Sequence, residues 1–189
     1  QLIDIAHLGS VYWIEEWFPS EPENDQAQWV NQKGLPPTDT LRPIWRQGIF
    51  GIDEILGFID TGLDVNHYAF RDPNIAITDT GEFPTHRKVV VFKKYPPAGG
   101  VGDPDGHGTH VGGTIAGSDS AMGGTDPRDG HAKGARISHL CPIPSSSYNF
   151  ITVFDVLTNT LRNPQLRTRT ISMSWWTGTM GQYSAKSME

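Results

Sequence analysis

Short apolar runs alternate with turn and helix patterns after residue 54, and this alternation limits the fold more than any other feature of the sequence. The runs at residues 55–59 and 88–92 are continuous enough for strands that are covered on both faces. Residues 135–143 are a further strand candidate, and residues 169–175 form a β-branched, apolar run. Helix patterns at residues 107–117 and 150–161 lie between the later runs. Strands and helices in this order predict an α/β fold, with a parallel sheet, right-handed crossovers and helices on both faces.

The size and charge of the chain narrow the classes of protein to consider. Its 189 residues suffice for one domain and an extra segment. Lys and Arg number 15 against 21 Asp and Glu, and a net charge of −6 argues against nucleic acid as a partner. No apolar run approaches the roughly 20 residues that cross a bilayer, so we expect no membrane span. The single cysteine, Cys141, cannot form an intrachain disulfide and is expected to fill the core.

Two regions of different character divide the chain. Residues 1–42 are aromatic and polar, include the acidic stretch 21–25, and offer one short helix pattern at residues 24–32. We predict that they form an irregular amino-terminal arm or the remnant of a leader. Residues 43–189 contain the alternating pattern and form the predicted domain.

Functional residues are expected where the strands end, because ligands bind at the carboxyl ends of parallel strands. Asp60 directly follows the run 55–59, although Asp60-Thr61-Gly62 alone is also typical of a simple turn. His107 opens a helix pattern rich in small residues, and the 47 residues between the two positions leave room for a return to the same edge. A carboxylate that holds one imidazole nitrogen leaves the other free to accept a proton. We therefore predict that Asp60 orients His107, which acts as a general base.

These residues resemble the motifs of a known family. Asp60-Thr61-Gly62-Leu63-Asp64 is similar to the aspartate motif, and Gly106-His107-Gly108-Thr109-His110-Val111 to the histidine motif, of the subtilisin-like serine peptidases, or subtilases. Residues 130–135 also resemble a segment that enters the next family strand, with Lys133 in place of the usual proline. The resemblance covers about residues 43–189 and is greatest to an alkaline branch of the family.

The resemblance implies a subtilisin-like fold and a serine endopeptidase that uses Asp60 and His107. It places Ser174, Trp175 and Trp176 on the substrate-binding rim, where a strand pairs with an extended peptide. It further implies peptide or protein substrates, a secreted or lumenal location, and a packing role for His110.

The chain also departs from the family pattern. The Gly-Thr-Ser motif that carries the nucleophile is not found: residues 178–180 read Gly-Thr-Met, and Ser184 and Ser187 lack the glycine-rich turn. We therefore predict an incomplete domain that is nearly inactive alone, with its exposed sheet edge covered by the remainder of the domain or by another chain. The alternative is a subtilase-derived binding or structural module that has lost catalysis.

Metal binding is a further reading of the same residues. His107 and His110, with Asp103, Asp105 and His131, could form a zinc-like site, but the spacing without a Cys pair or Glu base is weak. Oxygen ligands at residues 103–105 suit a structural calcium ion better, while a solvated acidic turn explains them more simply. No other cofactor is expected.

Overall fold

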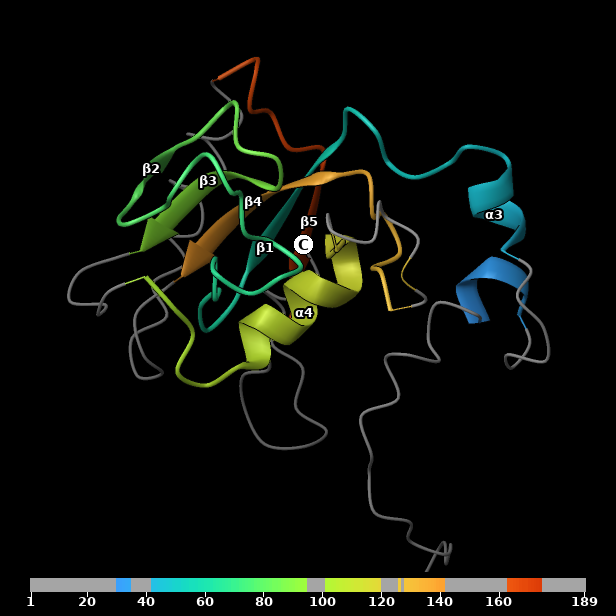
Figure 1. Ribbon diagram of the computed structural model, residues 1–189, viewed down its shortest axis with the longest axis horizontal. Coiled ribbons are helices and arrows are strands. Elements are labelled where there is room, and N and C mark those ends of the chain that lie inside the picture. The colour runs from blue at the N-terminus through green and yellow to red at the C-terminus, as the bar shows by residue number, and fades with distance from the viewer. Residues whose placement is uncertain are drawn as a thin grey trace, which may run out of the picture.

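The computed structural model describes residues 30–34, 42–94, 101–119, 126, 128–141 and 163–174. The predicted helix at residues 150–161 and the two tryptophans at 175 and 176 lie outside these ranges. Figure 1 shows a sheet with a helix, α4, lying across one face. Within the described ranges, no helix combines the length and the apolar character that a membrane crossing requires.

The sheet contains five strands in the order β2-β3-β4-β1-β5. Their bounds are β1 Ile55–Ile59, β2 Gly81–Glu82, β3 Val89–Lys94, β4 Arg136–Cys141 and β5 Thr170–Met173. The pairs β1 with β4, β1 with β5 and β3 with β4 are parallel, and the short β2 pairs antiparallel with β3. The mostly parallel α/β sheet is confirmed, and the four predicted runs coincide with β1, β3, β4 and β5.

The middle of the sheet is apolar on the face that meets α4. Phe58 of β1 and Phe92 of β3 flank His139 of β4, with ring centroids 4.3 Å and 5.6 Å from that of His139. His139 is 1% exposed, and its burial lowers its pKa to about 3, so the ring is neutral and packs as an aromatic side chain. The carboxyl end of β1 therefore rests on a layer of buried aromatic side chains.

Helix α4, His107–Ala116, packs closely against β1 through small residues. Gly108, Gly112 and Ala116 are its buried residues. A β-carbon added at Gly112 would lie 2.8 Å from Cζ of Phe58, so the helix approaches too closely for larger side chains. Val111 and Ile115 are partly buried against the core, whereas Thr114 lines a hollow. Close approach, rather than apolar volume, therefore selects the buried face of α4.

The segment before β1 is anchored to the loop before β4. The short helix α3, Pro43–Arg46, carries Trp45, which is 6% exposed and donates a hydrogen bond from Nε1 to the His131 carbonyl oxygen. The Lys133 ammonium lies 4.1 Å from the centre of the Trp45 ring. Oε1 of Gln32 accepts hydrogen bonds from the backbone N–H groups of residues 44 and 45, so contacts cross the predicted boundary at residues 42 and 43. The boundary itself stays a prediction.

Candidate active site

Asp60 and His107 meet at the carboxyl end of β1. Asp60 is the residue after that strand, and its backbone N–H donates to the carbonyl oxygen of Leu140 in the neighbouring β4. His107 is the first residue of α4. Its Nδ1 lies 2.7 Å from Oδ1 of Asp60, an oxygen that also accepts a hydrogen bond from the Thr61 N–H at 2.8 Å. The structure thus places side by side the two residues that the sequence pattern paired.

The two side chains differ sharply in exposure. The Asp60 side chain is 0% exposed, whereas that of His107 is 50% exposed. Within the described residues, Oδ2 of Asp60 has no hydrogen-bond donor, so His107 and Thr61 supply the contacts of this carboxylate. A buried carboxylate that holds one ring nitrogen, under a half-exposed ring, leaves the other nitrogen to act on a ligand.

Electrostatics favour a protonated His107. Its hydrogen bond to Asp60 raises the pKa of the imidazole; burial opposes this change, and the negative charges of Asp60, Asp105 and Asp103 add to it. The pair can therefore accept a proton and stabilise the imidazolium that results.

Asp103 belongs to the same site, which the sequence analysis did not foresee. Its Oδ1 accepts a hydrogen bond from the Thr61 hydroxyl at 2.9 Å. Its Oδ2 accepts hydrogen bonds from both the backbone N–H and the hydroxyl of Thr109, each at 2.7 Å. Burial alone would raise the pKa of Asp103, but the hydrogen bonds from Thr109 and Thr61 outweigh it and lower the pKa. The expectation of a merely solvated turn is therefore wrong for Asp103, and its position shortly before a helix start was the available clue.

The metal readings gain no support from the geometry. In the part of the chain that the structure describes, no three His, Cys, Asp or Glu side chains are grouped as a metal ion requires. That part includes His107, His110 and His131, the histidines of the zinc-like reading. A structural calcium ion at residues 103–105 stays a prediction.

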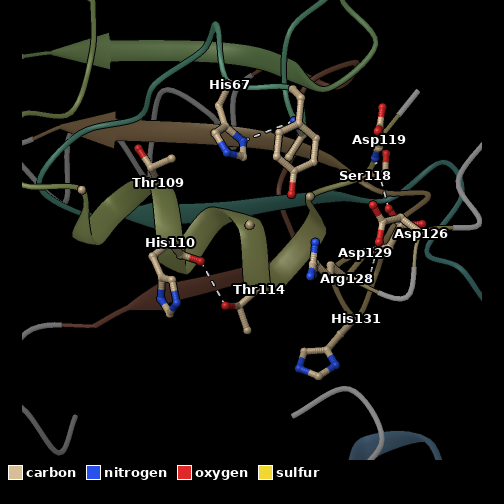
Figure 2. Close-up of a pocket in the computed structure, with 16 residues that line it drawn as sticks. His67, Thr109, His110, Thr114, Ser118, Asp119, Asp126, Arg128, Asp129 and His131 are labelled. Carbon is tan, nitrogen blue, oxygen red and sulfur yellow. Dashed lines mark hydrogen bonds between the residues drawn. The ribbon is translucent and has the colours of Figure 1, made fainter. Parts of the chain in front are cut away.

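His110 is exposed, so the packing role predicted for it is wrong. The small residues of α4 face the sheet, and His110 lies instead beside a hollow of about 370 Å³. Figure 2 shows this hollow, with His110 and Thr114 on its α4 side. It is lined by neither Asp60 nor His107.

The predicted substrate rim is described only in part. Ser174 follows β5 and is exposed, while Trp175 and Trp176 lie outside the described residues. β5 pairs with β1 along one side, and among the described strands it forms the edge of the sheet.

Cys141 has a more specific environment than that of a core filler. It is half-buried at the end of β4, and its Sγ donates to the Thr61 carbonyl oxygen at 3.0 Å. Burial raises the pKa of the thiol, and the nearby charges of Asp103 and Asp60 raise it further. The protonated thiol therefore adds one more contact to the segment that follows Asp60.

Comparisons with known proteins identify the family of the chain. The model of the subtilase family matches residues 51–188. The "Serine protease/ABC transporter B family protein tagA" of Dictyostelium discoideum is 31% identical over 188 residues, which are 95% of this chain and 10% of that protein. The tagD protein of the same organism and description is 42% identical over 72 residues, which are 36% of this chain and 4% of that protein. The chain thus spans a tenth or less of the length of either relative. Since the family model matches well over half of its residues, the chain belongs to the subtilase family.

Proposed function

We propose that this chain supplies the aspartate and histidine of a subtilisin-type serine endopeptidase that cleaves peptide or protein substrates. The observation that carries the proposal is the 2.7 Å contact between the buried Asp60 carboxylate and the half-exposed His107 imidazole. Asp60 accepts the Nδ1 proton, fixes the tautomer of His107 and stabilises its imidazolium.

The catalytic cycle requires a nucleophile beyond these two residues. Nε2 of His107 takes the proton of a serine hydroxyl as the serine oxygen attacks the peptide carbonyl carbon. The same proton then passes to the leaving amine, the C–N bond breaks, and water hydrolyses the acyl-enzyme. We place the serine and the oxyanion donor in polypeptide outside these 189 residues, and below we call the protein that contains both parts the complete peptidase.

We assign the substrate backbone to the carboxyl end of β5, on the side that no other described strand covers. An extended peptide can pair with an exposed parallel strand, and Ser174 stands at the end of β5 nearest the carboxyl edge. Trp175 and Trp176 would then line the side-chain subsites. A secreted or lumenal location is part of the same proposal. The two relatives, named as serine protease/ABC transporter proteins, are much longer than this chain.

Replacement of His107 tests the proposal. In the complete peptidase, His107→Ala should lower kcat by about a million-fold, the loss known for the equivalent change in a subtilisin. The protein should still fold, with the Thr61 N–H left as the donor to the Asp60 carboxylate. His110→Ala is the matched control, because it removes an exposed histidine from the same helix and should leave kcat unchanged. Peptide hydrolysis and labelling by a fluorophosphonate report on activity and on the reactive serine.

Two outcomes would contradict the proposal in different ways. Retained hydrolysis in His107→Ala would remove this residue from the mechanism. A folded complete protein that neither cleaves peptides nor reacts with the fluorophosphonate would favour the inactive binding module.

A further inference from the structure

We infer that Asp103 is a positioning residue of this site: its carboxylate joins the segment that carries Asp60 to the first turn of the helix that carries His107. The inference rests on the proposed function, because it concerns the contact between those two side chains. Asp103 touches neither of the reacting groups; it acts through Thr61 and Thr109.

The start of α4 lacks a cap of its own. Its N-cap is Gly106, which has a positive φ of 83° and no side chain to accept a hydrogen bond. The first N–H groups of a helix have no partner within the helix and need acceptors from outside. Here the Gly108 N–H donates to the Thr61 hydroxyl oxygen at 3.0 Å, and the Thr109 N–H donates to Oδ2 of Asp103 at 2.7 Å. The position of His107 therefore depends on two acceptors that lie outside α4.

The two acceptors, Thr61 and Asp103, are hydrogen-bonded to each other. A hydroxyl group has one proton, and Thr61 donates it to Oδ1 of Asp103. This donation fixes the rotation of the hydroxyl, so that its oxygen can accept from the Gly108 N–H. Because Thr61 is the neighbour of Asp60 in the chain, the same network fixes the backbone on which Asp60 stands.

A carboxylate suits this position better than an amide. All the groups that reach the two Asp103 side-chain oxygens are donors: the Thr61 hydroxyl at Oδ1, and the N–H and hydroxyl of Thr109 at Oδ2. An asparagine would present an acceptor to Thr109 and an N–H to the Thr61 hydroxyl, which would then have to rotate and accept from that N–H instead of donating. Asp103→Asn therefore keeps the size of the side chain and its hydrogen bonds from Thr109, but the Thr61 proton loses its acceptor and the hydroxyl is no longer held by a charged group.

Asp105 provides a matched control for the loss of charge. Like Asp103, it raises the pKa of His107 through its negative charge. It is exposed, and it receives neither the Thr61 hydroxyl nor the Thr109 hydrogen bonds. Asp105→Asn thus removes a charge near His107 without breaking the network.

The experiment compares these two variants in the complete peptidase. Asp103→Asn should lower kcat about ten- to a hundred-fold with little change in KM, because a catalytic group displaced by about 1 Å loses rate on this scale. Asp105→Asn should retain kcat. Both should move the acid limb of the pH profile to lower pH, since each removes a charge that raises the pKa of His107. The downfield proton resonance of Nδ1–H should broaden or disappear only in Asp103→Asn.

Equal kcat values and equal Nδ1–H resonances in the two variants would overturn the inference, leaving Asp103 with a charge effect alone. If Asp103→Asn fails to fold, a pair of changes at Thr61 decides instead: Thr61→Ser keeps the hydroxyl and should retain kcat, whereas Thr61→Val should lower it. Equal kcat in that pair would overturn the inference. His107→Ala, measured in parallel, separates the failures, because activity without His107 would contradict the proposed function itself.

Discussion

Gly108→Ala should disrupt the contact between Asp60 and His107 although it adds only one methyl group. A β-carbon at this position would lie 2.1 Å from the carbonyl oxygen of Gly62 and 3.0 Å from the β-carbon of Asp60. Atoms at a β-carbon are essentially never closer than 3.0 Å, so α4 and the loop after β1 must separate by about 0.9 Å, the difference between 2.1 and 3.0 Å. The obstacle is backbone, which no rotamer change can move aside.

The size of the effect follows from this displacement. Overpacking of this kind costs about 1–3 kcal/mol of unfolding free energy. A separation near 1 Å would also break a 2.7 Å hydrogen bond and lower kcat by about a hundred-fold. Thermal unfolding and peptide hydrolysis of the complete peptidase measure the two effects separately.

Gly113→Ala is the control within the same helix. A β-carbon there would meet nothing within 4 Å, and alanine favours a helix over glycine by up to about 1 kcal/mol. Gly113→Ala should therefore raise the melting temperature and keep activity, while Gly108→Ala lowers both. If the two variants behaved alike, the close approach of α4 to the loop after Asp60 would not be what positions the site.

Two further predictions concern lysines at the loop before β4: Lys133 lies in this loop, and Lys88, which precedes β3, donates from its ammonium to the carbonyl oxygens of residues 133 and 135. Burial lowers the pKa of Lys88 to about 7, below the usual 10.5. Between these two values the unfolded chain binds more protons than the folded one, so the free energy of unfolding should rise with pH from 7 to 10. Chemical denaturation at several pH values should show this rise in the wild type but not in Lys88→Met. The Lys133 ammonium lies over the Trp45 ring and 3.6 Å from Oδ2 of the buried Asp129, so Lys133→Met should lower the free energy of unfolding, with about 0.5–2 kcal/mol from the ring contact. An unchanged midpoint in denaturant would show that neither contact contributes.

β1 and β3 were predictable because each contains a continuous apolar run next to turn residues, whereas β4 and β5 mix apolar with polar residues and were less clearly marked. The run at residues 55–59 matches β1 at both ends, since Asp60 cannot continue an apolar strand. β2 was not predicted, because Gly81–Glu82 has neither an apolar run nor alternation. The four residues of α3 are likewise too few for a helical period. Short elements of this kind are held by tertiary contacts, which a local pattern does not contain.

Only those site residues that the local sequence pattern marks could be predicted. Asp60 follows a strand and His107 opens a helix pattern, so both positions could be assigned to one edge of the sheet. Asp103 could not, because its role depends on a hydroxyl at Thr61, 42 residues away, and on the missing side-chain cap at Gly106. Without these partners, the sequence does not distinguish Asp103 from an ordinary solvated acidic turn.

Gly108 and Asp103 both allow α4 to lie close to the loop after β1: Gly108 leaves the space, and Asp103 accepts a hydrogen bond from the helix. Without a side chain at Gly108, α4 can approach the loop after β1 until His107 reaches Asp60. That approach also brings the N–H groups of residues 108 and 109 against the loop, where they need acceptors because the helix itself offers none. Thr61 and Asp103 supply those acceptors from the loop side. The contact between Asp60 and His107 therefore needs both the space and the hydrogen bonds, and either change alone should loosen it by a different physical route.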